Sequence, residues 1–154
     1  MSNHYHLMAS TSVGHDLPKV MQIFQREVSR RINLQANRKN HLFGDRYQAS
    51  IIKSENYYYY ALKYLYRNPI ESGLCCEIEN YNFSTLSKYT FKIHKPANGI
   101  DSLISYNRLD FLNYINEDDY SNELHMLIEK RISQKEFAWP KRMNKSVRNQ
   151  IKFR

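Results

Sequence analysis

The sequence predicts an α+β domain with a helical extension and a basic tail behind it. Two short segments, residues 3–9 and 46–53, show the alternation of polar and apolar residues that is typical of strands. Longer segments repeat apolar residues every three or four positions, as helices with one buried face do. We therefore expect a first domain over residues 1–95, a helical extension over 96–137 and a tail over 138–154.

The first predicted strand, residues 3–9, is followed by a predicted helix. His4 and His6 point to the same face of that strand, because side chains alternate along an extended chain. Asp16 is a residue type that caps helices, and Pro18 suits a first helical turn. The apolar face of this helix is formed by Leu17, Val20, Met21, Phe24, Val28 and Ile32.

A second helix is predicted to begin after Ser54. Tyr64 and Asn68 are four residues apart, so they share one face of it. Pro69 has no amide hydrogen and is predicted to interrupt the helix. An alternative is that the tyrosines on this face are simply packed core, and composition does not select Tyr64 among 13 tyrosines. The other two tyrosines of this face are Tyr57 and Tyr60.

The second half of the chain is predicted to be mainly helical. Helical spacing recurs over residues 108–115 and 122–133, whereas residues 89–93 show a weak alternation. The tail after Trp139 is basic and poor in apolar residues, so we expect it to be flexible unless it is bound.

The charge of the chain is basic, with 23 Lys and Arg against 15 Asp and Glu and a formal net charge of +8. Residues 17–53 hold eight basic and two acidic residues, and residues 138–154 hold six basic residues and no acid. Such a distribution favours a polyanionic partner, although a merely soluble basic surface is the alternative.

Compartment and redox state follow from other features. Cys75 and Cys76 are neighbours, and no Cys/His set with zinc spacing surrounds them, so two reduced thiols are expected. No apolar run approaches the ~18 residues of a membrane span, and no signal peptide is recognisable. We expect a cytoplasmic protein of a bacterial type that does not enter a membrane.

Three motifs resemble those of the single-tyrosine transposases of the insertion-sequence type. The branch associated with repetitive extragenic palindromes is the most similar, and the match covers about residues 1–86. The first motif is the histidine–hydrophobe–histidine sequence of residues 2–7. The second is the loop His-Leu-Phe-Gly-Asp-Arg-Tyr at residues 41–47, and the third is the tyrosine helix with its continuation at residues 64–74.

The resemblance implies a ferredoxin-like antiparallel sheet with helices and a specific chemistry. His4, His6 and Asn68 would bind a divalent metal, Mg²⁺ or Mn²⁺, and Tyr64 would be the nucleophile. Single-stranded hairpin DNA would be cleaved and rejoined through a 5′-phosphotyrosine link. The basic residues expected to hold the DNA backbone are Arg26, Arg30, Arg31 and Arg46.

The sequence departs from this family at its start. Members carry a strand–helix–strand segment ahead of the two-histidine strand, and this sequence begins at that strand. We therefore expect an N-terminally truncated domain, which arises either from a start assigned too late or from a gene shortened at its 5′ end. A sheet without its first strands exposes an edge, which a homodimer would cover. Two alternatives stay open: an inactive remnant that binds DNA, and an interaction protein whose tyrosines are core and whose histidines do not bind metal.

Overall fold

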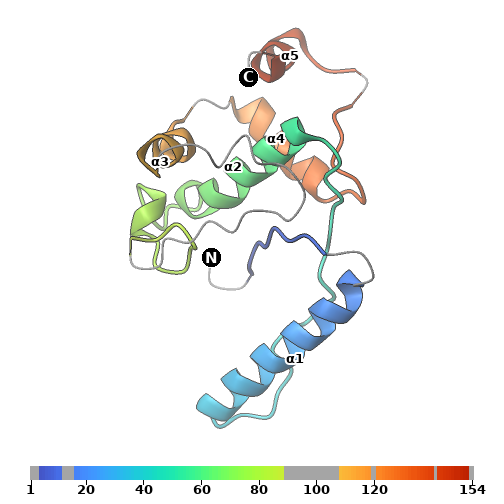
Figure 1. Cartoon of the computed structure of the whole chain (residues 1–154), viewed down its shortest axis with the longest axis vertical. Coiled ribbons are helices and arrows are strands. Elements are labelled where there is room, and N and C mark those ends of the chain that lie inside the picture. The colour runs from blue at the N-terminus through green and yellow to red at the C-terminus, as the bar shows by residue number, and fades with distance from the viewer. Residues whose placement is uncertain (1–3, 12–15, 89–107, 119–120, 141, 153–154) are drawn as a thin grey trace. The chain divides into compact units, whose positions relative to one another are not determined.

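The regular secondary structure of the computed structural model is helical throughout the part of the chain that it describes (Figure 1). It describes residues 4–11, 16–88, 108–118, 121–140 and 142–152. These residues form five α-helices and one short 3-10 helix, and no sheet is present among them. One isolated bridge pairs Ile51 with Glu136 in parallel.

The predicted α+β, ferredoxin-like fold is therefore wrong. A strand is stable only when a neighbouring strand receives its amide and carbonyl groups, and alternation along one segment does not reveal whether that neighbour exists. Residues 4–11 have no strand beside them among the described residues. Ile51 donates to the carbonyl of Lys135 at 3.0 Å and accepts from Phe137 at 3.0 Å, but the pairing extends no further. The weak alternation at 89–93 lies outside the described residues.

The chain divides into two units, each considered by itself. One comprises Met1–Met8 with Ala49–Arg154, and the other comprises Ala9–Gln48. The predicted boundary at residue 95 falls outside the described residues. The homodimer was expected because of an exposed sheet edge, and the described residues contain no such edge.

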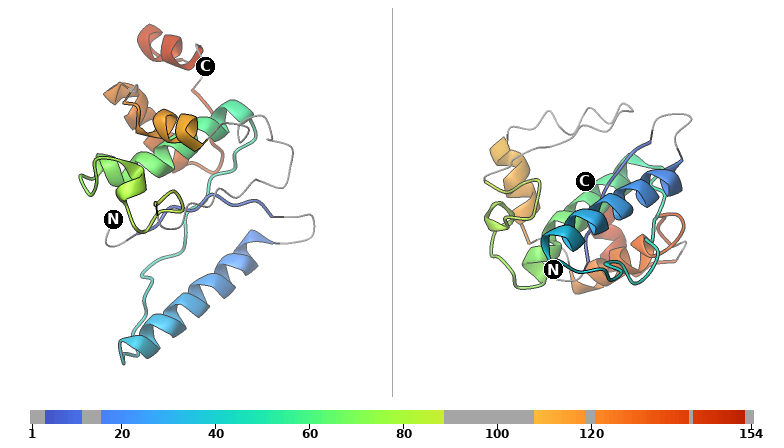
Figure 2. Two further views of the ribbon diagram at one scale, coloured as in Figure 1. Left: turned by 60° about the vertical axis from the view of Figure 1, so that its left-hand side comes forward. Right: turned by 90° about the horizontal axis from the view of Figure 1, so that it is seen from below.

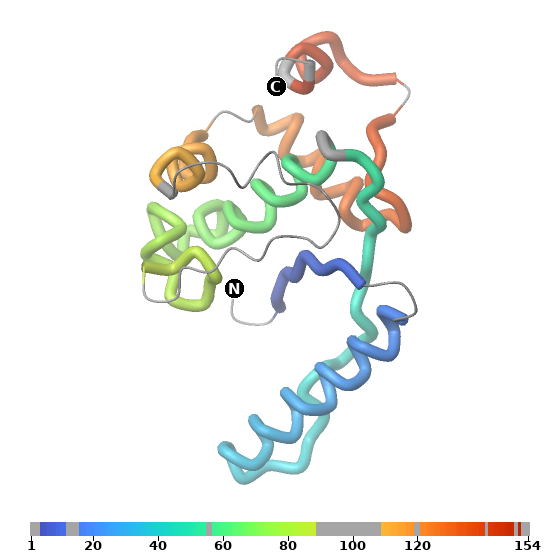
Figure 3. Tube along the Cα trace, in the orientation of Figure 1, coloured from blue at the N-terminus to red at the C-terminus, as the bar shows by residue number. Residues whose placement is uncertain are grey.

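The smaller unit consists of α1, Leu17–Gln35, and the segment that returns beside it (Figure 3). The predicted helix is confirmed: Asp16 occupies the N-cap position, although its side chain makes no capping hydrogen bond. At the other end, Asn37 has a φ of 46°, and the side chain of Asn33 donates to the carbonyl of Asn40 at 2.9 Å. These contacts turn the chain back along α1. The predicted apolar face of α1 lies within the described residues and is largely exposed, and Met21 is its one buried residue.

The larger unit is built around α2, Glu55–Glu71. This helix contacts η1, Ile78–Asn80, and also α3, Arg108–Asn116, and α4, Asn122–Ile132 (Figures 1 and 2). Both predicted C-terminal helices are thus confirmed. The Ser54 cap is confirmed as well, since its hydroxyl accepts the amide of Tyr57 at 3.4 Å.

Pro69 does not interrupt α2, contrary to the prediction. It lies in the last turn, where the helix lacks the one hydrogen bond that an amide at this position would donate to the carbonyl of Leu65, and the helix ends two residues later. The helix ends in a Schellman motif: Leu74 donates to the carbonyl of Pro69 and Gly73 to that of Ile70, both at 2.9 Å. Gly73 has a φ of 68°, a conformation that glycine adopts without strain.

Both sides of α2 are covered by apolar side chains. Tyr58 and Leu62 pack into one cluster. Tyr60, Ala61 and Tyr64 pack into the second. The first cluster is completed by residues of η1, α3 and the loop between them, namely Ile78, Leu86, Phe111, Leu112 and Ile115. The second is completed by Leu124, Ile128, Phe137 and Val147.

The basic tail is ordered rather than flexible over its described part. Residues Lys145–Lys152 form α5. Val147 is buried in the second cluster, and Met143 and Ile151 pack at its margin. Two apolar side chains one turn apart, with Met143 just before the helix, hold one face of this short helix against the core.

Arg67 links α2 to the end of α3. Its guanidinium donates to the carbonyls of the last two α3 residues, Ile115 and Asn116, at 3.4 and 3.0 Å, and to that of Glu117 just after the helix at 2.9 Å. It also forms two hydrogen bonds, of 3.0 and 2.8 Å, with Glu71. Carbonyls at a helix C-terminus have no partners within the helix, so a buried cation there satisfies them and complements the helix dipole.

Replacing Arg67 with alanine is expected to lower the free energy of unfolding by about 3 kcal/mol, because buried acceptors lose a charged donor. Urea denaturation followed by circular dichroism measures this loss. Arg67→Lys recovers part of it, since an ammonium group cannot reproduce the planar fork. The exposed Arg142 gives the control, and Arg142→Ala should cost less than about 0.5 kcal/mol. Equal losses in Arg67→Ala and Arg142→Ala would contradict this role.

Candidate active site

Tyr64 lies on the side of α2 that faces the second cluster, and it is buried with 7% of its surface exposed. Asn68, one turn further along, makes a side-chain hydrogen bond to the phenol. The predicted relation of these two residues on one helix face is confirmed. The alternative view of the tyrosine stripe also holds in part, because Tyr60 and Tyr64 are both core residues.

The N-terminal segment brings its histidines to this side of α2. Met8 packs against both apolar clusters, which anchors the segment. The rings of His6 and Tyr64 meet edge to face with centroids 5.9 Å apart. The rings of His4 and His6 meet in the same way at 5.2 Å. His4, His6, Tyr64 and Asn68 are therefore brought together, although no sheet positions them.

The pKa of the His6 imidazole is lowered from its ordinary value. Partial burial is the main cause, because it penalises the charged form, and the neighbouring His4 adds a second, electrostatic one. Both effects keep the ring neutral. A neutral imidazole is the form that binds a metal ion.

The pKa of the Tyr64 phenol is raised. Burial is the largest cause, and the carboxylate of Glu129 acts in the same direction. The hydrogen bond from Asn68 opposes both by stabilising the phenolate. The neutral phenol is therefore favoured over the phenolate while Tyr64 is packed in this way.

Helix α4 contributes residues that the sequence analysis missed. The ring of His125 lies over the Tyr64 ring with centroids 5.4 Å apart and an interplanar angle of 38°. Glu129 is one turn further along α4. His125 and Glu129 each follow a buried residue, Leu124 and Ile128 respectively. The helical spacing of the apolar residues over 122–133 could therefore have placed both side chains beside the core-facing side of the helix.

The donors beside Tyr64 suit a borderline divalent ion. His4 and His6 offer two adjacent imidazoles, and Asn68 offers an amide oxygen. Within the described residues no group of three or more His, Cys, Asp or Glu side chains could hold a metal. Any site built here therefore depends on the amide as its third protein ligand, and on the two histidines coming together on one ion.

The predicted DNA-binding arginines belong to the smaller unit and differ in their surroundings. Arg30 and Arg31 both pair with Glu27, with shortest distances of 2.7 and 2.8 Å, and these side chains are largely exposed. Arg26 and Arg46 line an open pocket of about 410 Å³ within the same unit. The ion pairs with Glu27 reduce the charge that Arg30 and Arg31 offer to a polyanion.

The two cysteines are free thiols, as predicted, with Cys75 partly buried and Cys76 exposed. Among the described helices, none combines the length and the hydrophobicity needed to cross a membrane.

Comparison with known proteins adds no identification. No protein-family model matches the chain, and neither a curated protein nor a solved structure is significantly similar to it. The resemblance to single-tyrosine transposases therefore stays a prediction, which depends on the motifs themselves.

In the metal-free protein, the pKa of His6 is expected below its ordinary value of 6.5. A pH titration of the imidazole resonances by NMR measures it. His4→Gln removes the like charge but leaves the burial, so the pKa should rise only part of the way.

The same shift makes stability depend on pH. The folded protein binds fewer protons at His6 than the unfolded chain does. The contribution of neutral His6 to the free energy of unfolding is therefore fully present above about pH 6.5 and is lost as the pH falls through the folded pKa. A His6 pKa at or above 6.5 would contradict its packing against Tyr64 and His4.

Proposed function

We propose that this chain cleaves and rejoins single-stranded, hairpin-bearing DNA through a covalent link to Tyr64, assisted by a Mg²⁺ or Mn²⁺ ion on His4, His6 and Asn68. The juxtaposition of the His6 and Tyr64 rings, 5.9 Å apart, carries the proposal. These residues are distant in the sequence, and the motifs selected them without knowledge of the fold. Their proximity supports a common role.

The proposed reaction is a transfer of a phosphodiester bond. The Tyr64 phenol loses its proton as its oxygen attacks the scissile phosphorus and forms a tyrosyl phosphate, while the bond to the 3′ oxygen breaks. The departing oxygen takes up a proton and becomes a free 3′-hydroxyl. Attack by the 3′-hydroxyl of another strand reverses these changes and releases Tyr64.

Each neighbour of Tyr64 has a part in that reaction. Asn68 bonds the phenol and stabilises its anionic form, which is the stronger nucleophile. His6 contacts the edge of the ring and so limits its rotation. A bound divalent ion would supply Lewis-acid polarisation of a phosphate oxygen. The basic unit, with Arg26 and Arg46, supplies charge for the DNA backbone.

The second candidate function, DNA binding without cleavage, is favoured by one observation. Tyr64 is 7% exposed and is covered on one side by His125, so its oxygen has little access to a phosphate in this conformation. Cleavage requires α4 or the N-terminal segment to move away from the phenol. A chain in which they do not move would bind DNA and leave it intact.

Covalent capture distinguishes the two functions. The protein is incubated with labelled single-stranded hairpin DNA and Mn²⁺ or Mg²⁺, and the products are separated on a denaturing gel. A protein-linked band is expected with the unmutated chain, and removal of the metal with EDTA, Tyr64→Phe or His4→Ala should abolish it.

Tyr60→Phe is the matched control, because Tyr60 belongs to the same buried stripe and its hydroxyl donates to the carbonyl of Ile151 at 3.4 Å. The band should persist in this variant. No band in any lane, with DNA binding retained, would overturn the cleavage proposal in favour of binding alone. A band that survives in Tyr64→Phe would exclude Tyr64 as the nucleophile.

A further inference from the structure

The smaller unit contains a pocket of which the proposed function uses only the charge of two lining residues, Arg26 and Arg46. It has a volume of about 410 Å³ and opens between α1 and the returning segment. This volume lies within the usual range for small-molecule sites, about 300–1,000 Å³. Its lining comes from Gln25, Arg26 and Ser29 of α1 and from residues 41–46.

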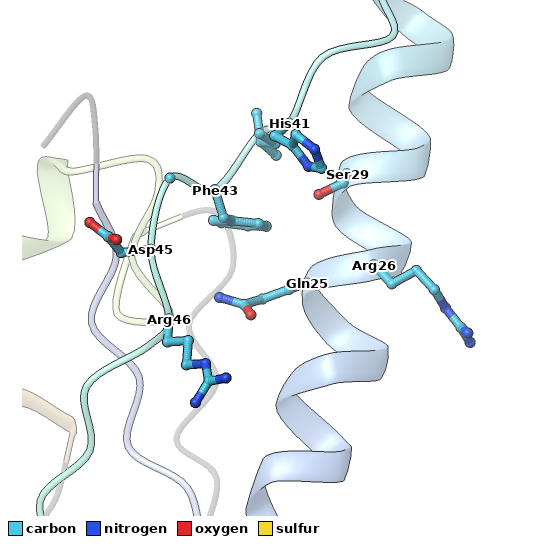
Figure 4. A pocket seen from close by; sticks show the side chains of 9 residues that line it. Gln25, Arg26, Ser29, His41, Phe43, Asp45 and Arg46 are labelled. Carbon is cyan, nitrogen blue, oxygen red and sulfur yellow. The ribbon is translucent and has the colours of Figure 1, made fainter.

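Figure 4 shows how the lining side chains are directed. The Phe43 ring and the Arg46 guanidinium extend from the returning segment toward α1, and Gln25 extends from α1 toward them. The carboxylate of Asp45 points away from α1, and Arg26 points away from the returning segment. An aromatic face, an amide and a guanidinium thus converge in the pocket without an opposing carboxylate.

These groups match the parts of one nucleotide. Phe43 lines the pocket and is half-buried, so part of its side chain is accessible to a base. The amide of Gln25 and the hydroxyl of Ser29 can hydrogen-bond the edge of a base. Arg46 is exposed and carries the charge and planar donor array that suit a phosphate.

The charge of the unit favours a polyanion over a neutral ligand. Residues 9–48 include seven Lys and Arg but three acids. Glu27 pairs with Arg30 and Arg31, so the charge available to a ligand comes mainly from the other basic residues of the unit, Arg46 among them. Both faces of a base within a duplex are covered by its neighbours, so stacking on Phe43 requires a base that is unpaired and turned out.

We propose that this pocket binds one unpaired nucleotide of a single strand, with its base against Phe43 and its phosphate on Arg46. The site belongs to the smaller unit and Tyr64 to the larger one, so it serves a chain that cuts DNA as well as one that only binds it. Arg26, a lining residue whose side chain points away from the returning segment, strengthens binding through its charge.

The test is a double-mutant cycle on protein and ligand. Binding is measured by fluorescence anisotropy in the Tyr64→Phe background, so that no covalent link forms. The probes are a short oligothymidylate and an abasic oligonucleotide of equal length and charge. The ratio of their affinities reports base stacking, and it should fall about fivefold or more in Phe43→Leu. Phe83→Leu, at a phenylalanine that is 90% exposed in the other unit, should leave the ratio unchanged.

The phosphate contact is tested in the same assay. Arg46→Gln should weaken both probes by the same factor and reduce the salt dependence by about one ion. Arg38→Gln, at an exposed arginine that does not line the pocket, should have a smaller effect. A ribonucleotide probe of the same sequence shows whether the preferred strand is RNA or DNA.

Two results would overturn the proposal. If the unmutated chain binds the two probes with equal affinity, it contacts the backbone charge alone and no base. This comparison uses the unmutated chain, so it does not depend on how any variant at Phe43 folds. An unchanged affinity ratio in Phe43→Leu would place base stacking elsewhere. Neither result bears on covalent capture by Tyr64, so the two proposals fail separately.

Discussion

Burial of α2 on both sides is the constraint on which the larger unit depends. One side carries Tyr58 and Leu62 into contact with η1 and α3, and the other carries Tyr60 and Tyr64 into contact with α4 and the C-terminal segment. A helix apolar on both sides cannot be covered by a single neighbour, so segments from both ends of the chain are recruited to it. The N-terminal segment is one of them, through Met8.

This packing also explains why the candidate site exists without a sheet. Tyr64 occupies the core side of α2, and His6 contacts it because Met8, two residues further on, is anchored in the same core. The site is thus held by hydrophobic burial and ring contacts. The same burial shields the Tyr64 phenol and raises its pKa, and the packing of α4 places the His125 ring against the Tyr64 ring. The packing that brings these residues together therefore also covers Tyr64. A reaction at Tyr64 requires the neighbouring segments to move away from it.

Local signals predicted the helices well. Spacing identified α1, α3 and α4, and Ser54 identified the start of α2, because these features depend on residues close together in sequence. The sheet was wrongly predicted because pairing depends on distant residues, and the alternation at residues 3–9 and 46–53 carries no information about a partner. The tail was wrongly judged for a similar reason: the docking of Val147 depends on a cluster formed by α2 and α4. His125 was missed because its relation to Tyr64 exists only once α4 has packed.

The account depends most on the contact between the N-terminal histidines and α2. The most direct measurement is a nuclear Overhauser experiment on metal-free protein with labelled histidine and tyrosine. We expect cross-peaks from the ring of Tyr64 to the rings of both His6 and His125, since the centroids lie 5.9 and 5.4 Å away. A cross-peak to His125 without one to His6 would contradict the account, because α2 and α4 would then pack as described while the histidine segment lay elsewhere.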